Sequence, residues 1–333
     1  MTEEDRFRRR RAIETRTARE NQFQPHTPLG AGGEFDAIRR MLERWGPHAR
    51  RIGDDAAVIT SLGDRGLVVS IDTSVENVHF KRDWLSPCEI GYRAAASALS
   101  DLAAMGAKPL GMLVAMAIPD EWRKQIDGLT DGIGDAARAV DAPILGGDMS
   151  RSGELALTFT VLGAAREALF RTGSRPGDHV YVTGRLGGSG AALKALSENR
   201  QPRPADREKF AHPVPRIREA IWLTERGATA AIDISDGLSS DLSHLGCASR
   251  VAINVDLAAV PCVDGVPPQD AVGSGEEYEI VVTSPTEFDS EAFFSHFNLE
   301  LTRIGSVERG KAGVSFFLDG SLIEVQGGYL HFG

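Results

Sequence analysis

Apolar residues in the first half of the chain follow two different spacings. Intervals of three and four predict amphipathic helices over 34–45, 89–105 and 126–140. Short β-branched runs bounded by Gly or Asp predict buried strands over 56–60, 67–71, 112–118 and 155–163. A further short run at 144–145 leads into the turn-like sequence Gly146-Gly147-Asp148. The alternation of the two patterns indicates a mixed α and β fold.

The second half repeats this alternation. Strands are predicted over 180–183, 230–234, 278–283, 302–307 and 314–318. One helix is predicted over 191–197, and another is expected to begin at Ser235, directly after a strand. Four prolines between 202 and 215 flank a charged stretch, which indicates a linker or an exposed loop.

Two domains are expected, because 333 residues exceed the size at which one hydrophobic core usually stops growing. The first series of alternating strands and helices ends near Ala165, which predicts domains at 31–165 and 166–333. Residues 1–30 are polar and rich in Arg without apolar periodicity, so they are predicted to be a flexible extension.

Composition excludes several classes of protein. The net charge of −10 argues against a chain that coats nucleic acid, since phosphate neutralisation needs a surplus of Lys and Arg. The three cysteines lie far apart without zinc-site or disulfide spacing, which fits a reducing cytoplasm. No run approaches the roughly 20 apolar residues of a membrane span. A cytoplasmic enzyme that gathers divalent cations is consistent with these features.

Carboxylates recur where apolar runs end in turns. Each one alone is typical of a solvated turn or a helix cap. Together they indicate a shared site, because clustered carboxylates repel one another unless cations compensate their charge. This pattern favours magnesium carrying phosphates, held by the acidic residues Asp54, Asp55, Asp72, Asp148, Asp233 and Asp236.

Asp101 and the sequence Asp233-Ile-Ser-Asp236-Gly each leave two interpretations open. Asp101 falls in the last turn of the 89–105 helix, where the macrodipole disfavours a negative charge, so either a compensating group or a surface position near Lys108 explains it. A plain helix cap accounts for Ser235 and Asp236 but leaves Asp233 unexplained.

Familiar nucleotide-binding patterns are missing from the sequence. The glycines of 183–190 lack the GxGxxG spacing, and no acidic residue closes a following strand about 20 residues later, so a tight turn is preferred. The chain has no P-loop, no HRD and DFG pair and no GxSxG elbow. His79 is a lone loop histidine, and Glu276 and Glu277 lie in a turn before a strand.

Seven segments in register resemble the thiamine-monophosphate kinase family. The likeness extends from about residue 33 to the C-terminal end. It is carried by Gly53-Asp-Asp-Ala-Ala57, 70–80 with Asp72 and His79, 99–107 with Ser-Asp101-Leu, Gly146-Gly-Asp148, 171–178, Asp233-Ile-Ser-Asp-Gly-Leu238 and Gly275-Glu276.

The resemblance implies an α+β fold of the α/β sandwich type. Two PurM-like domains are expected, in which the N-terminal sheets of two subunits close into a barrel and the C-terminal domain is α/β. This is the ATP-binding fold of aminoimidazole ribonucleotide synthetase. A homodimer that binds ATP, thiamine monophosphate and several Mg²⁺ ions is therefore expected.

Site roles also follow from the resemblance, position by position. Magnesium ligands fall at Asp55, Ser70, Asp72, Asp101, Asp148, Asp233 and Asp236. ATP contacts fall at Gly147, Asp148, Arg171 and Ser235. Contacts to thiamine monophosphate fall at His79, Asp101, Glu276 and Gln326. No general base is implied, and Asp101 is the nearest candidate for a catalytic residue.

Four residues, at three places in the chain, depart from the family pattern. Ile71 stands where the family often has Thr, Ser274 and Glu277 stand in a turn that is usually Gly-Gly-Glu-Asp, and Gln326 stands where an aromatic residue often contacts the substrate. Ile71 removes a hydroxyl from the metal neighbourhood, the turn at Ser274 is expected to differ in shape, and Gln326 affects the strength of substrate binding but not the ATP site.

The expected activity is direct, magnesium-assisted in-line transfer of the γ-phosphoryl group from ATP to thiamine monophosphate. Two alternatives stay open at this level. One is another ATP enzyme of the same fold, such as a selenophosphate or aminoimidazole ribonucleotide synthetase. The other is a nucleotide-binding regulator without catalysis.

Overall fold

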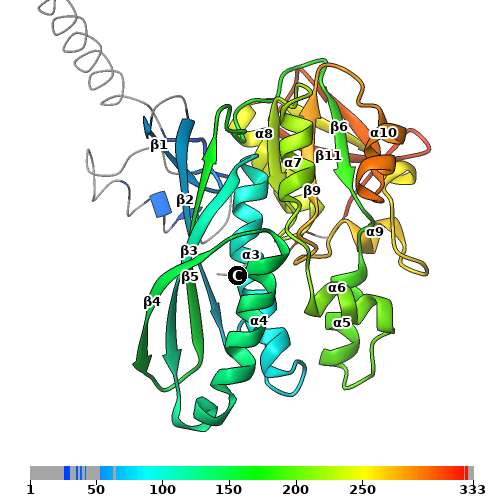
Figure 1. Cartoon of the computed structure of the whole chain (residues 1–333). Helices are drawn as coiled ribbons and strands as arrows, with labels where there is room; N and C mark the ends of the chain where they lie inside the picture. Colours follow the sequence, from blue (N-terminus) through cyan, green and yellow to red (C-terminus); the bar gives the residue numbers. More distant parts are fainter. Residues whose placement is uncertain are drawn as a thin grey trace, which may run out of the picture.

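The computed structural model describes residues 26–30, 35, 36, 38, 39, 42, 53–62, 65–325, 327 and 328. The chain is built around two β-sheets with helices packed on and between them (Figure 1). The α+β class expected from the sequence is confirmed. Residues 1–25 of the predicted 1–30 extension and most of the 34–45 segment lie outside the described residues, although the described positions of the 34–45 segment are helical.

The first sheet has five strands in the order β1-β2-β5-β3-β4. Neighbours are antiparallel except β3 and β4, which are parallel. Helices α3 and α4 lie on one face of this sheet (Figure 1). The elements are β1 (Ala57–Leu62), β2 (Arg65–Val75), α3 (Pro87–Ala104), β3 (Lys108–Ile118), the 3₁₀ helix η2 (Asp120–Gln125), α4 (Ile126–Ala139), β4 (Ile144–Arg151) and β5 (Ala156–Ala165).

The second sheet has seven strands in the order β12-β11-β8-β10-β6-β9-β7. Alternate residues of its central strands enter two different cores: Val180 and Val182 pack toward α8, whereas Tyr181 joins the core around α3. The elements are β6 (His179–Thr183), α5 (Gly188–Ser197), α6 (Pro204–Ala211), α7 (Ile217–Thr224), β7 (Ala230–Asp233), α8 (Leu238–Ser249), β8 (Ala252–Asp256), η3 (Leu257–Ala259), α9 (Pro268–Ala271), β9 (Ile280–Ser284), α10 (Ser290–Phe297), β10 (Leu301–Glu308), β11 (Gly313–Leu318) and β12 (Ser321–Ile323).

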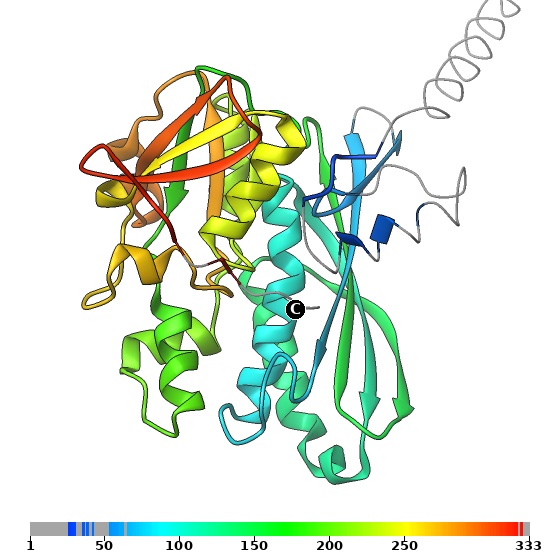
Figure 2. The ribbon, with the colours of Figure 1, turned by 180° about the vertical axis from the view of Figure 1, so that it is seen from behind.

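Helix α3 lies between the two halves of the molecule, packing on β2 and β5 on one side and on α7 and β7 on the other (Figure 2). It begins at a capping box in which Ser86 and Glu89 bond reciprocally to each other's backbone N–H groups. Its alanines and leucines are buried around the whole circumference, as expected of a helix inside a core. The helix therefore positions side chains toward both sheets.

Two predicted elements are wrong. The expected turn at Gly146-Gly147-Asp148 is the middle of strand β4, because the chain pairs with β3 so closely that a Cβ on Gly147 would lie 1.9 Å from the Val114 carbonyl oxygen. The proline-flanked stretch contains α6 instead of a linker, since Pro204 occupies the first helical turn and Phe210 is buried.

A helix start is also wrong. Helix α8 begins at Leu238 and not at Ser235, and its N-cap is Gly237 without a side-chain cap bond. Ser235 is therefore not an N-cap. Its carbonyl oxygen accepts the Glu276 N–H at 2.7 Å, which ties the end of β7 to the segment before β9.

Candidate active site

A cavity of about 800 Å³ lies between the two halves of the molecule. Most of its wall comes from five segments that are far apart in the sequence: 53–55, β2 with the turn after it, α3, 233–241 and 273–278. The structure therefore brings most of the sequence-predicted site residues into one enclosure.

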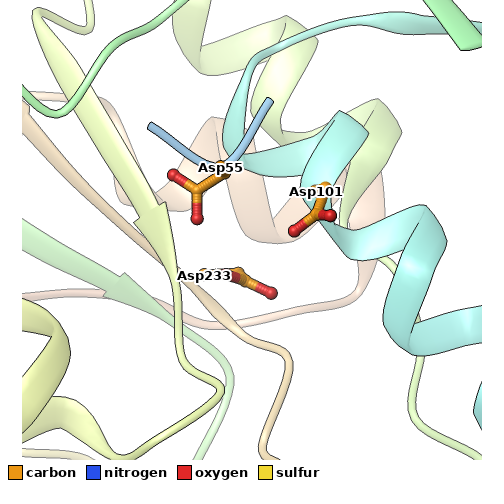
Figure 3. A group of neighbouring side chains, drawn as sticks. All are labelled: Asp55, Asp101 and Asp233. Carbon is orange, nitrogen blue, oxygen red and sulfur yellow. The ribbon is translucent and has the colours of Figure 1, made fainter. Parts of the chain in front are cut away.

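Three carboxylates form the centre of this cavity (Figure 3). Asp55 precedes β1, Asp101 lies in the last turn of α3 and Asp233 ends β7. One oxygen from each lies within 4.8 Å of the others. Carboxylate oxygens at this spacing suit a hard divalent cation.

Two serine hydroxyls orient the carboxylates. The Ser100 hydroxyl donates to Asp233 Oδ2 at 2.6 Å. The Ser70 hydroxyl lies 2.5 Å from Asp101 Oδ2 and 2.9 Å from the Asp55 carbonyl oxygen. Since Ser100 and Asp101 are consecutive on α3, one turn of this helix contacts both Asp233 and Ser70.

Crowding of negative charge changes the pKa values of these groups. Burial, followed by repulsion from Asp55, raises the pKa of Asp233 to about 7. Burial, followed by repulsion from Asp233 and Asp55, raises the pKa of Asp101 well above its ordinary value. A compensating cation would remove this penalty, including the unfavourable effect of the helix dipole on Asp101 at the end of α3.

Arg171 supplies the positive charge in this cluster. Its Nη2 and Nε donate to the two oxygens of Asp55 at 2.6 and 2.9 Å. Its backbone N–H donates to Asp54 Oδ1, and the Thr27 hydroxyl donates to Asp54 Oδ2. Asp54 therefore acts as a structural anchor, whereas Asp55 keeps free lone pairs that point into the cavity.

Asp72, Ser235 and Asp236 also line the cavity. Asp72 is on β2, and the Ser97 hydroxyl of α3 donates to its Oδ2 at 3.1 Å. Ser235 and Asp236 form the turn between β7 and α8. These three residues share the cavity wall with the central carboxylates.

His79 and Glu276 line the same cavity. The Val75 N–H donates to His79 Nδ1 at 3.1 Å, so this nitrogen is an acceptor and the proton resides on Nε2. Glu276 has a left-handed backbone with φ of 58° and forms an ion pair with Arg93 of α3.

Two predicted residues that the structure describes are not brought into the cavity, and a third cannot be placed. Gly147 and Asp148 are on the exposed edge strand β4 and do not line it. Gln326 lies outside the described residues. The chain beside it does return to the site, because the Gly328 N–H donates to Ser240 Oγ at 3.0 Å.

Comparison with known proteins decides the family. The N-terminal domain model of AIR synthase related proteins matches residues 53–165, and the C-terminal domain model matches 175–317. The thiamine-monophosphate kinase of Escherichia coli K12 is 35% identical over 91% of this chain and 99% of that protein. This chain belongs to the thiamine-monophosphate kinase family. The corresponding kinase of Bacillus subtilis is 34% identical over 90% of this chain and 99% of its own length.

A solved structure of the same family has a closely similar fold. AaThiL complexed with AMPPCP and TMP has a TM-score of 0.78 and 29% identity, covering 93% of this chain and 99% of that chain. The resemblance read from the seven sequence segments is confirmed by these matches.

Two departures from the family pattern contact each other. The Ser274 hydroxyl donates to Glu277 Oε1 at 2.6 Å, and the same oxygen accepts the N–H groups of Gly187 and Ser189 at the start of α5. Lys209 reaches the other oxygen at 3.1 Å. Ser274 and Glu277 therefore form one buried network that anchors the turn.

Removing this anchor should destabilise the protein. Glu277→Ala is expected to lower the free energy of unfolding by about 3–5 kcal/mol, because it leaves the Gly187 and Ser189 N–H groups and the Ser274 hydroxyl without their shared acceptor. Urea unfolding followed by circular dichroism measures the change. Glu198→Ala removes a carboxylate from an exposed ion pair with Arg200 and should leave the free energy of unfolding almost unchanged. Equal losses in both variants would contradict this role of Glu277.

Two buried polar residues of the cavity were missed by the sequence reasoning. Asp241 accepts the Gly237 N–H at 3.1 Å, and Arg93 pairs with Glu276. A signal for Arg93 existed: Arg93, Ser97 and Ser100 recur at helical spacing on a helix that is otherwise almost entirely apolar. Asp241 has the ordinary appearance of an acidic residue in a first helical turn.

Proposed function

We propose that this protein transfers the γ-phosphoryl group of ATP to thiamine monophosphate, producing thiamine diphosphate and ADP. The observation that carries the proposal is the cluster of Asp55, Asp101 and Asp233 inside a cavity of a chain from this family. The AaThiL complex supports the choice of substrates, since AMPPCP is an analogue of ATP and TMP is thiamine monophosphate.

The donor set of the cavity fits magnesium. Oxygen ligands are abundant, and a bound cation would relieve the repulsion between carboxylates whose oxygens lie within 4.8 Å of one another. We propose that one chain supplies the metal ligands Asp55, Ser70, Asp72, Asp101, Asp233 and Asp236. We propose that Asp148 is supplied by a second copy of the chain. Bound Mg²⁺ would neutralise phosphate charge between two anionic substrates.

The proposed step needs no covalent enzyme intermediate. A phosphate oxygen of thiamine monophosphate forms a bond to the γ-phosphorus while the bond from that phosphorus to the β–γ bridging oxygen breaks, and ADP leaves with that electron pair. Arg171 and Ser235 would contact ATP from the carboxylate side. His79 and Glu276 would hold the thiamine monophosphate. Most of the rate acceleration would then come from holding the two substrates in the geometry of the reaction.

Asp148 cannot share an ion with Asp72 inside one chain. Strand pairing aligns Asp148 on β4 with Ala115 on β3, which is aligned with Thr158 on β5. Thr158 is in turn aligned with Thr73 on β2, the residue next to Asp72. Three strand spacings separate β4 from β2, or roughly 14 Å. We propose that Gly147 and Asp148 instead complete the site of a second copy of the chain.

The first sheet offers a suitable surface for that second copy. Strand β1 pairs with β2 only as far as Val69, so the half of β2 that carries Ser70 and Asp72 has an open edge among the described strands. The first sheet also exposes apolar side chains, among which Ile71 and Leu113 alternate with residues that face α3 and so lie on the opposite face; the others are Leu110, Ile144, Leu145 and Met149. A homodimer would cover them.

Domain and cellular assignments stay proposals. The two sheets favour domains at 31–165 and 166–333. Among the described residues, no helix is both long and apolar enough to cross a membrane. Cys88, Cys247 and Cys262 are unpaired thiols, which is compatible with the proposed cytoplasmic location.

One incubation tests the function. Purified protein with ATP, Mg²⁺ and thiamine monophosphate should form thiamine diphosphate and ADP in equal amounts, as separated by chromatography. ADP with free phosphate but no thiamine diphosphate would point to another ATP enzyme of this fold. Nucleotide binding without any product would point to a regulator.

Metal binding should be visible without catalysis. In metal-free protein the raised pKa of Asp233, about 7, means that the folded state keeps a proton that the unfolded chain loses above about pH 4. The melting temperature should therefore fall as pH rises from about 4 to about 7, and added Mg²⁺ should restore it at pH 8. A melting temperature at pH 8 that Mg²⁺ leaves unchanged would contradict the metal site.

A further inference from the structure

Helix α3 presents one polar face to the cavity. Arg93, Ser97 and Ser100 follow one another at intervals of four and three, so they lie along one side of the helix. Ser97 bonds to Asp72, and Ser100 bonds to Asp233. Arg93 is the N-terminal member of this face. It contacts none of the proposed metal ligands, so binding of metal and phosphate does not explain why a buried arginine is placed there.

Arg93 is a buried cation with one acidic partner. Its side chain is only 5% exposed, and its Nη2 forms an ion pair with Glu276 Oε2. Its Nε donates to the Phe210 carbonyl oxygen at 2.8 Å, and the guanidinium lies 4.2 Å from the centre of the Phe210 ring. These contacts fix the guanidinium against α6, so Glu276 is held by a rigid group.

The backbone around Glu276 is strained. Glu276 and Tyr278 both have left-handed φ values, 58° and 51°, which are rare for residues with large side chains. Hydrogen bonds to the end of β7 maintain this shape: the Glu276 N–H donates to Ser235 O, and the Tyr278 N–H donates to Ile234 O. Strain kept by so many contacts is typical of a functional site.

The two adjacent glutamates of this turn point in different directions. Glu277 is fully buried and bonds to the start of α5 and to Lys209. Glu276 keeps 25% of its side chain exposed and lines the cavity. The turn therefore uses Glu277 as its anchor and leaves the Glu276 carboxylate available for a ligand.

We propose that Arg93 is a positioning residue for substrate recognition, which fixes the Glu276 carboxylate so that it receives the cationic heteroaromatic part of thiamine monophosphate. The inference rests on the proposed function. Thiazolium carries a permanent positive charge, and a carboxylate held in place on an enclosed wall favours a cation over a neutral ring. Arg93 acts through Glu276 and does not itself touch the substrate.

The test is a double-mutant cycle between Arg93→Gln and Glu276→Gln in the full chain. Arg93→Gln is expected to raise the KM for thiamine monophosphate and its dissociation constant, measured by calorimetry, by about tenfold to a hundredfold. The KM for ATP should change less than about twofold. In the Glu276→Gln background, Arg93→Gln should have little further effect.

Arg216→Gln is the matched control. Arg216 is also a buried arginine that pairs with a buried glutamate, Glu279, through two contacts of 2.7 and 2.8 Å, and neither residue lines the cavity. This variant should lower the melting temperature without changing the affinity for thiamine monophosphate. An equal rise of that KM in both variants would reduce Arg93 to a structural ion pair and overturn the proposal.

Other outcomes are equally decisive. Independent, additive effects of Arg93→Gln and Glu276→Gln would overturn the inference, as would an unchanged affinity in Arg93→Gln. Should that variant not fold, Arg93→Lys replaces it, because Lys keeps the charge but lacks the fork that reaches both Phe210 and Glu276. A several-fold rise in KM that disappears in the Glu276→Gln background supports the proposal. Wild-type protein that does not bind thiamine monophosphate would instead refute the proposed function.

Discussion

Asp233→Asn is expected to lower kcat by about three orders of magnitude, because a metal-held phosphoryl transfer loses several kcal/mol of charge stabilisation with one central carboxylate. The fold should be kept. Asn has the same shape, and its carbonyl oxygen can still accept the Ser100 hydroxyl that lies 2.6 Å from Asp233 Oδ2. Steady-state kinetics and the increase in melting temperature caused by Mg²⁺ should both show the loss.

Stability separates this result from damage to the fold. Without metal, Asp233→Asn should melt at or above the wild-type temperature at pH 8, since it removes a buried charge beside Asp55. The control is Asp178→Asn, a buried carboxylate outside the cavity that accepts the Thr229 hydroxyl. It should lower the melting temperature while keeping turnover. Wild-type turnover in Asp233→Asn would contradict the central role of the cluster.

Local sequence patterns predicted the residues of the carboxylate cluster well. Asp233 stood out because a helix cap could not explain it, and Asp101 because its place at a helix end was unfavourable. Both lie in the cluster with Asp55. In each case the signal was a conflict between a residue and the local structure around it, and such conflicts concentrate at functional sites.

Contacts between distant segments could not be predicted in this way. Arg93 and Glu276 are separated by 183 positions, and their pairing depends on α3 packing against the second half of the chain. The start of α8 was misplaced for a related reason. Ser235 has the composition of a cap, but its backbone is held by the Glu276 N–H, a contact that local propensity does not include.

Asp148 illustrates a different limit. Its sequence context predicted a metal-binding turn. The structure instead places Asp148 on the edge strand β4, outside the cavity. A sequence pattern does not state which copy of a chain completes a site. If two copies combine, the exposed strand β4 of one copy would bring its Asp148 to the cavity of the other, beside the open edge of β2.

Mixing two inactive variants should therefore restore activity. If Asp148 of one chain serves the cavity of its partner, a dimer of one Asp148→Asn chain and one Asp233→Asn chain has one doubly altered site and one intact site. Random pairing makes half of the dimers mixed, so activity should recover to about a quarter of wild type. A mixture of Asp55→Asn and Asp233→Asn is the control, because both residues line the cavity of their own chain and every mixed site stays defective. Recovery in neither mixture, with subunit exchange verified by mass spectrometry of differently tagged chains, would place Asp148 in a role within its own chain or outside the site.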